Sequence, residues 1–144
     1  MAGQKILILG DSGSGKSTAT RNLDAKTTFY INVIGKALPF KGWKSKYVAG
    51  KNLITTHNAE EIIKAIQGVS KLEAFKHIKT IVVDDAQYIM AYEFMARALE
   101  KGYDKFSEMG QHMFNVLKAP DATRDDLTTI FLSHTEDVSA NGYM

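Results

Sequence analysis

The sequence predicts an α/β protein in which a mostly parallel β-sheet is covered by helices on both faces, giving three layers. Short apolar runs alternate along the chain with segments of helical period. These runs lack polar alternation, as expected for strands that are buried on both faces. Three of them lead directly into residues that suit a ligand site, at Gly10, Asp84 and His134. With 144 residues, the chain suits one domain spanning residues 1–144.

The first apolar run, residues 6–9, predicts a buried strand that leads into Gly10-x-x-x-x-Gly15-Lys16-Ser17, the phosphate-binding P-loop pattern. Glycines here accept positive φ and place no Cβ between backbone and ligand, so successive N–H groups can form an anion-binding nest. A helix predicted at residues 17–23 adds the positive end of its dipole. Lys16 would reach the β- and γ-phosphates, and the Ser17 hydroxyl would bind Mg²⁺. The expected nucleotide-binding residues are Gly10, Asp11, Ser12, Gly13, Ser14, Gly15, Lys16, Ser17 and Thr18.

The middle of the chain predicts a second strand at residues 27–32, a long loop at 33–51 and a short strand at 53–56. Asn58 and Glu61 predict a helix start, with Asn58 as the N-cap. Ile62, Ile66 and Val69 would face the core from this helix, which we expect to extend to about residue 75.

The last third predicts a buried strand at residues 79–84, a helix at 88–101 and a final strand at 128–133. Gly102 stands where a glycine often ends a helix. Asp104 is expected to cap a further helix that stops at Pro120. Both helices carry apolar stripes that we expect to pack in the core, namely Tyr88, Tyr92, Met95 and Leu99 in the first and Phe106, Met109, Met113 and Val116 in the second.

Asp84 follows four residues of a buried strand, which is a Walker B pattern. Its carboxylate would hold Mg²⁺ opposite Ser17, and Asp85 is placed to deprotonate an attacking water. The alternative for either aspartate is that it caps the following helix. Since a polar residue at the end of the next strand can sense a γ-phosphate, His134 is a candidate sensor, with an ordinary loop histidine as the alternative.

Residues 25–59 contain no acidic side chain but six lysines. Within this stretch, lysines alternate with aromatic residues, a composition that favours contact with unpaired nucleic acid. The candidate contacts are Lys41, Trp43, Lys44 and Lys46. Alternatively, Trp43 packs the loop onto the sheet or covers the adenine of a bound nucleotide.

Other features exclude several classes of protein. There is no cysteine, no apolar run long enough for a membrane span and no signal peptide, so we expect a cytoplasmic protein without membrane contact. The chain has three arginines, few for a nucleotide kinase that must neutralise two phosphorylated substrates. An arginine finger would have to be Arg97 or Arg124, although ordinary surface positions are the expectation for both. A guanine-reading Asn-Lys-x-Asp segment is missing, which disfavours a GTPase.

With these motifs in place, the chain resembles the phage-encoded, RecA-like P-loop ATPases, an AAA-type group linked to phage DNA recombination. The resemblance is carried by the P-loop, by residues 31–43 with their Lys-Gly-Trp, by residues 83–90 with Asp-Asp-Ala-Gln-Tyr, and by residues 101–106. It implies a core that binds ATP and Mg²⁺, hydrolyses ATP to ADP and acts on single-stranded DNA in annealing or strand exchange. It also implies a homo-oligomer in the host cytoplasm, and a chain that is truncated at its C-terminus relative to the family. The alternatives are a nucleotide-dependent assembly or DNA-binding module that does not hydrolyse ATP and, less favoured, a small nucleotide kinase.

Overall fold

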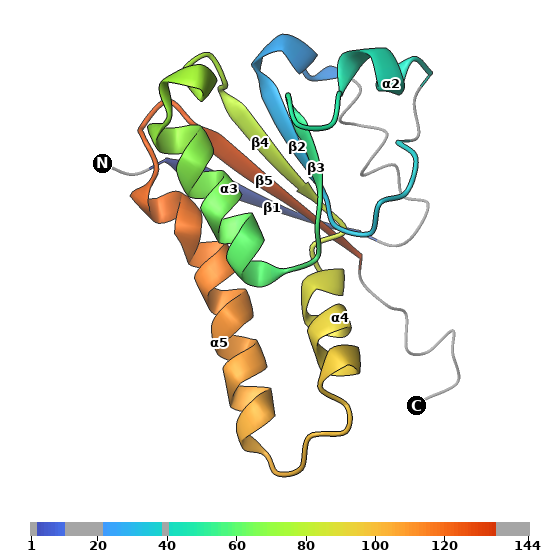
Figure 1. Ribbon diagram of the computed structural model, residues 1–144. Helices are drawn as coiled ribbons and strands as arrows, with labels where there is room; N and C mark the ends of the chain where they lie inside the picture. Colours follow the sequence, from blue (N-terminus) through green and yellow to red (C-terminus); the bar gives the residue numbers. More distant parts are fainter. Residues whose placement is uncertain (1–2, 11–21, 39–40, 135–144) are drawn as a thin grey trace.

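The computed structural model describes residues 3–10, 22–38 and 41–134, which form an α/β fold around a parallel sheet (Figure 1). The sheet has five strands in the order β1-β5-β4-β2-β3, and every pairing is parallel. The strands are β1 (Gln4–Gly10), β2 (Thr28–Asn32), β3 (Leu53–Thr55), β4 (Thr80–Asp84) and β5 (Thr128–His134). The α-helices are α2 (Trp43–Lys46), α3 (Ala59–Lys71), α4 (Tyr88–Ala96) and α5 (Asp104–Lys118), and short 3₁₀ turns are η2 (Ala25–Thr27), η3 (Glu73–Phe75) and η4 (Ala119–Ala122).

The two faces of the sheet carry separate cores, because successive side chains of a strand point to opposite faces. On one face, Phe29, Ile31 and Phe131 pack with the buried residues of α3 and α5. On the other face, Tyr30 and Val82 pack with the segment that includes α2. Figure 1 shows α3 and α5 lying across the same side of the sheet. These two packed faces confirm an α/β sandwich of the expected class, while the helix expected at residues 17–23 lies largely outside the described residues.

Strand β1 differs from the prediction, since it is an edge strand whose only partner among the described strands is β5. The expected buried strand is exposed, with Ile6 at 47%, Leu7 at 54%, Ile8 at 37% and Leu9 at 58% of their accessible surface. The apolar run predicted the strand correctly but not its place in the sheet. That place is set by which strand pairs with which, and this information is non-local.

Helix α3 begins as its sequence predicts. The Asn58 side chain accepts a hydrogen bond from the Glu61 backbone N–H at 3.0 Å, so Asn58 is the N-cap. Ile62, Ile66 and Val69 are buried on one face of the helix. The helix ends at Lys71, and the η3 turn replaces the last part of the predicted helix.

Helix α4 is shorter than predicted, because it ends at Ala96 and not at residue 101. The side chain of Lys105 donates to the backbone carbonyls of Arg97, Ala98 and Glu100 at 2.7–3.4 Å and so satisfies acceptors just beyond the helix end. Gly102 has φ +91° but lies in the loop between α4 and α5, so its assignment as the glycine ending the helix was wrong.

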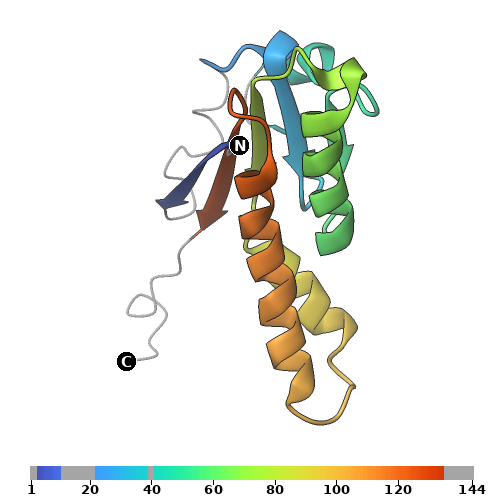
Figure 2. The same ribbon diagram turned by 90° about the vertical axis from the view of Figure 1, so that its left-hand side faces the viewer.

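The expected core stripe of α4 was also wrong. Tyr88 and Tyr92 are each 38% exposed, Met95 is 70% exposed and Leu99 is 97% exposed, whereas Ile89 is buried. Figures 1 and 2 show why, since α4 and the first half of α5 extend beyond the carboxyl end of the sheet. The prediction for α5 holds in part, with Met109 and Val116 buried and Phe106 at 45% exposure.

Candidate functional site

The carboxyl ends of β1, β5 and β4 meet at one edge of the sheet. Gly10 of β1 is level with His134 of β5. Val83 of β4 is level with Phe131, so Asp84 ends β4 two residues short of His134. Neighbouring strands are about 4.8 Å apart, which places the lines of β1 and β4 about 10 Å from one another. The structure therefore brings the start of the predicted P-loop pattern, the candidate sensor position and Asp84 of the predicted Walker B pattern to a common edge, where ligands of parallel α/β sheets bind.

Asp84 is a buried carboxylate with 1% of its surface exposed. Its Oδ2 accepts a hydrogen bond of 2.5 Å from the hydroxyl of Tyr30, which is completely buried. Tyr30 reaches it from the neighbouring strand, because Asn32 is the register partner of Asp84 and Tyr30 lies two residues earlier on the same face. A bond from a buried phenol to a carboxylate fixes the carboxylate orientation and offsets part of the cost of burying its charge.

Asp85 is 2% exposed, and its Oδ2 lies 3.0 Å from the ammonium of Lys36, whose side chain is 37% exposed. Its φ of 60° places it in the left-handed region, where non-glycine residues are uncommon and aspartate is among the better tolerated. Strained backbone of this kind is concentrated at functional sites. The conformation turns the chain out of β4, after which the Ala86 N–H donates to the Leu132 carbonyl at 2.9 Å.

The loop after β2 places Lys36 next to Asp85. The side-chain amide of Asn32 donates to the Lys36 carbonyl at 2.7 Å, and its Oδ1 accepts from the Gly35 N–H at 3.2 Å. Gly35 has φ +73°, a conformation that glycine adopts without strain. Asn32 therefore closes a tight turn that brings the lysine back over the end of the sheet.

The helix-capping alternative for the two aspartates is not what the structure shows. Helix α4 has Gln87 as its N-cap, and the Gln87 side chain makes no capping hydrogen bond. Gln87 instead accepts from the Ser133 hydroxyl at 3.3 Å, which links the start of α4 to the end of β5. The Asp84 carboxylate accepts a hydrogen bond from Tyr30, and the Asp85 carboxylate pairs with Lys36.

Several predicted site residues lie outside the described part of the chain. These are Asp11, Ser12, Gly13, Ser14, Gly15, Lys16, Ser17 and Thr18. Their phosphate and Mg²⁺ roles stay predictions. For His134 the structure describes the backbone position at the end of β5, and its role as a sensor also stays a prediction.

The basic loop divides into parts with different environments. Trp43 is partly buried and packs against the core cluster of Tyr30 and Tyr47, as the packing alternative for the loop expects. Burial raises the pKa of the Tyr47 phenol above its ordinary value. Lys41 and Lys44 are exposed, and the Lys44 ammonium is 5.8 Å from the centre of the Trp43 ring. Lys46 lines a separate hollow at the amino ends of the strands, away from Asp84.

The two arginines considered as fingers, Arg97 and Arg124, are both engaged within this chain, and neither is an ordinary surface side chain. Arg97 pairs with Glu93, Glu100 and Glu108 at 2.9–3.1 Å, and these carboxylates raise its pKa. Arg124 forms an ion pair with Asp126 at 2.9 Å. It also donates to five backbone carbonyls from the last turn of α3 and the segment that leads to β4, those of Val69, Ser70, Phe75, Lys76 and Ile78.

Sequence reasoning missed the partners of the two aspartates. Tyr30 looked like an ordinary strand residue, and only the register of β2 against β4 places its hydroxyl at Asp84. Lys36 was one of six lysines in the acid-free stretch, without a feature to distinguish it. The usable signal was local, since Asn32 and Gly35 directly after a strand indicate a tight turn that sends the next residue back toward the strand ends.

Comparison with known proteins adds no identification. No protein-family model matches the sequence, and a search of curated proteins gives no significant match. The functional argument therefore depends on the motifs and on the geometry of the site.

Proposed function

We propose that this protein is a P-loop ATPase of the RecA-like class that binds ATP with Mg²⁺, hydrolyses it to ADP and acts on single-stranded DNA in phage recombination. The observation that carries the proposal is the common edge of β1, β5 and β4. The P-loop pattern starts from Gly10 at this edge, two strands from the buried Asp84 carboxylate. A triphosphate held by the pattern would thus lie beside a carboxylate.

The residues present fit a magnesium site of the kind that nucleotides complete. Mg²⁺ in phosphate-transfer proteins is bound by one or two carboxylates or hydroxyls together with substrate phosphates and water. Among the described residues, no three His, Cys, Asp or Glu side chains form a metal cluster. Asp84, oriented by Tyr30, and Ser17 would hold the ion. Bound there, Mg²⁺ would neutralise charge developing on the phosphate oxygens.

Asp85 would take the proton of the attacking water. In that step the water oxygen forms a bond to the γ-phosphorus, the bond to the β-γ bridging oxygen breaks, and the proton moves to the Asp85 carboxylate. In the present arrangement this carboxylate lies 3.0 Å from the Lys36 ammonium. Lys36 must therefore shift toward the phosphates, or share its hydrogen bonds with them, for Asp85 to accept the proton.

The same ion pair favours one second candidate, a module that uses ATP for assembly and does not hydrolyse it. If the ammonium of Lys36 stays on Asp85 in the nucleotide complex, the carboxylate has no role as a base. The kinase alternative gains no support, because Arg97 and Arg124 are both held by partners inside the chain.

The test is ATP binding and hydrolysis by the full chain, with and without single-stranded DNA. Lys16→Ala should abolish ATP binding. Asp85→Asn should retain binding and lose about 100-fold or more in hydrolysis, the range expected for loss of a general base. Asp125→Asn is the matched control, since it makes the same chemical change at an exposed position.

Hydrolysis in the wild-type protein that is unaffected by Asp85→Asn would refute the role of Asp85. Tight ATP binding without any hydrolysis would support the assembly module. Retention of ATP binding in Lys16→Ala would refute the proposed phosphate site.

A further inference from the structure

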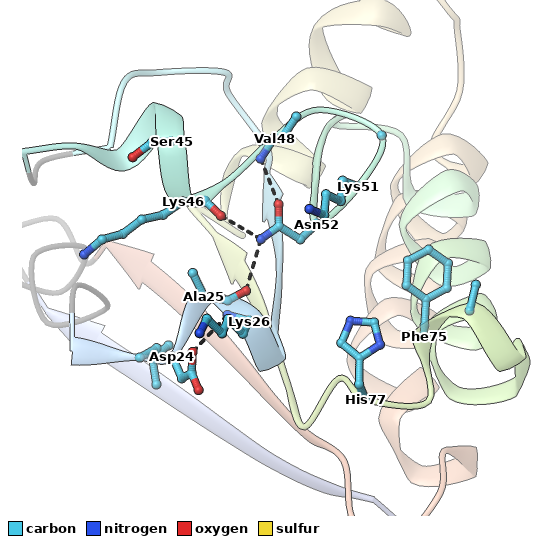
Figure 3. A pocket seen from close by; sticks show the side chains of 13 residues that line it. Asp24, Ala25, Lys26, Ser45, Lys46, Val48, Lys51, Asn52, Phe75 and His77 are labelled. Atoms are coloured by element: carbon cyan, nitrogen blue, oxygen red, sulfur yellow. Dashed lines mark hydrogen bonds between the residues drawn. The ribbon is translucent and has the colours of Figure 1, made fainter.

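A hollow lies at the amino ends of the strands, at the end of the sheet opposite Asp84. Its walls are the segments that directly precede β2, β3 and β4, and its volume is about 730 Å³. This volume is within the usual range of ligand pockets. Strand β4 has five residues, so the two edges of the sheet are about 16 Å apart. The residues that matter here are Lys26, Lys46, Lys51, Asn52, Phe75 and His77 (Figure 3).

The rim of this hollow is basic. Lys26 lies in the segment before β2, Lys46 and Lys51 lie in the segment before β3, and His77 adds an imidazole from the segment before β4. The one acidic side chain in the lining, Asp24, accepts a hydrogen bond from the Lys26 backbone N–H at 3.0 Å and thereby caps η2. In Figure 3 the side chains of Lys46 and Lys51 lie on opposite sides of Asn52. Charges spread in this way suit successive phosphates of a chain better than one phosphate group.

Asn52 holds the basic segments together. Its side-chain amide donates to the carbonyls of Ala25 at 3.1 Å and Lys46 at 2.9 Å, and its Oδ1 accepts from the Val48 N–H at 2.8 Å (Figure 3). With 8% of its surface exposed, Asn52 is buried. The segments that carry the three lysines are thus joined through one side chain, so little ordering is needed when a ligand binds.

Phe75 supplies an apolar surface inside the basic rim. Its ring contacts Phe29 edge-on, with centroids 5.5 Å apart and an interplanar angle of 88°. This contact with a core residue fixes the ring, and the partly buried Phe75 is one of the residues that line the hollow. A fixed aromatic ring within a basic groove is the arrangement that proteins use to stack unpaired bases while lysines neutralise the phosphates.

We infer that this hollow is a binding site for single-stranded DNA, in which Lys26, Lys46 and Lys51 contact successive phosphates and a base packs on Phe75. A double helix keeps its bases stacked inside, so it could offer phosphates to the rim but no base to Phe75. The inference deepens the proposed function and rests on its DNA-binding part, because it places the DNA and the ATP on opposite edges of the sheet. Binding at the hollow does not require hydrolysis.

The experiment measures binding of a fluorescent oligothymidine to the full chain by anisotropy, over a range of salt concentrations, without nucleotide and again with ATP and Mg²⁺. The variant Lys26→Glu/Lys51→Glu should bind about tenfold or more weakly. It should also lower the slope of log K against log salt by about 1.4, since each phosphate contact to a single strand contributes about 0.7. Phe75→Leu keeps an apolar side chain and should lose roughly tenfold through weaker stacking.

The matched control is Lys64→Glu/Lys101→Glu, which makes the same change of net charge at exposed lysines away from the hollow. Thermal melting of each variant shows that it is folded. Equal weakening in both double variants would overturn the assignment, because net charge alone would then explain the loss. Duplex DNA that binds as tightly as the single strand, with the same sensitivity to Phe75→Leu, would also overturn it.

The outcomes separate this inference from the proposed ATPase. A protein that binds oligothymidine through the hollow but shows no hydrolysis would refute the ATPase proposal and support the site. A protein that hydrolyses ATP but fails to bind the oligonucleotide under either condition would refute the site together with the DNA-binding part of the proposed function, and would leave the ATPase part standing.

Discussion

Replacement of Tyr30 by phenylalanine tests the central contact of the carboxyl edge. Tyr30→Phe removes a single oxygen and keeps the ring, which packs 5.2 Å from the ring of Tyr47. The lost bond is the 2.5 Å donation to Asp84, a carboxylate that is 1% exposed. Because water has little access to replace the donor, we expect the free energy of unfolding to fall by about 2 kcal/mol, within the range for hydrogen bonds to charged groups.

The measurement is urea unfolding followed by far-ultraviolet circular dichroism. With a slope of about 2 kcal/mol/M, the midpoint should fall by about 1 M while the slope stays the same. Thermal melting should shift downward by roughly 6 °C, since about 3 °C per kcal/mol is usual for a domain of this size. Tyr103→Phe is the matched control, because Tyr103 is 86% exposed and its loss should change stability by less than about 0.5 kcal/mol.

The same variant reports on metal binding. If Asp84 holds Mg²⁺, Tyr30 is the residue that orients the ligand, and loss of such a partner commonly weakens metal affinity by about 10- to 100-fold. The Mg²⁺ concentration needed for half-maximal ATPase activity should therefore rise in Tyr30→Phe and stay constant in Tyr103→Phe. A Tyr30→Phe protein as stable as Tyr103→Phe would refute the argument that the buried bond stabilises the fold. An unchanged Mg²⁺ requirement would refute the link between Tyr30 and the metal.

Three further predictions concern other contacts. Lys36→Met should lower the free energy of unfolding by about 2 kcal/mol in urea titrations, which is less than for a fully buried pair because the lysine is partly exposed. The double variant Lys36→Met/Asp85→Asn should recover part of this loss, because it also removes the charge that Lys36→Met leaves buried. No recovery would contradict a direct pair. Arg124→Lys should lower the free energy of unfolding by at least about 2 kcal/mol in the same assay, because one ammonium cannot replace a guanidinium that binds five carbonyls. A decrease below about 0.5 kcal/mol would contradict that role. Hydrogen bonding to Lys79 lowers the pKa of Asp126 below its ordinary 3.8. This pair therefore stabilises the fold at pH values above 3.8, and its contribution is lost as the pH falls through the lower pKa that Asp126 has in the folded protein. Asp126→Asn should therefore flatten the acid limb of a plot of melting temperature against pH, and an unchanged limb would refute the assignment.

Most of the elements could be predicted from local sequence because their signals are local. An Asn58 cap followed by Ile62, Ile66 and Val69 specifies both the start and the buried face of α3, and the structure confirms both. The same reasoning failed for α4, where apolar residues at helical spacing remain exposed. Periodicity indicates that a helix has an apolar face, but it does not say whether another element covers that face.

The sequence by itself determined the α/β class and the approximate positions of its strands, together with the candidate chemistry of Gly10, Asp84 and Asp85. Apolar runs and turn residues act over a few positions, so the chain shows them directly. Only the tertiary structure decided that β1 is an edge strand, that Tyr30 binds Asp84 and that Lys36 pairs with Asp85. It also gathered lysines from separate segments around a hollow at the amino edge. These features depend on strand order and register, which are set by the packing of the whole sheet. A single motif of a few residues therefore does not predict them.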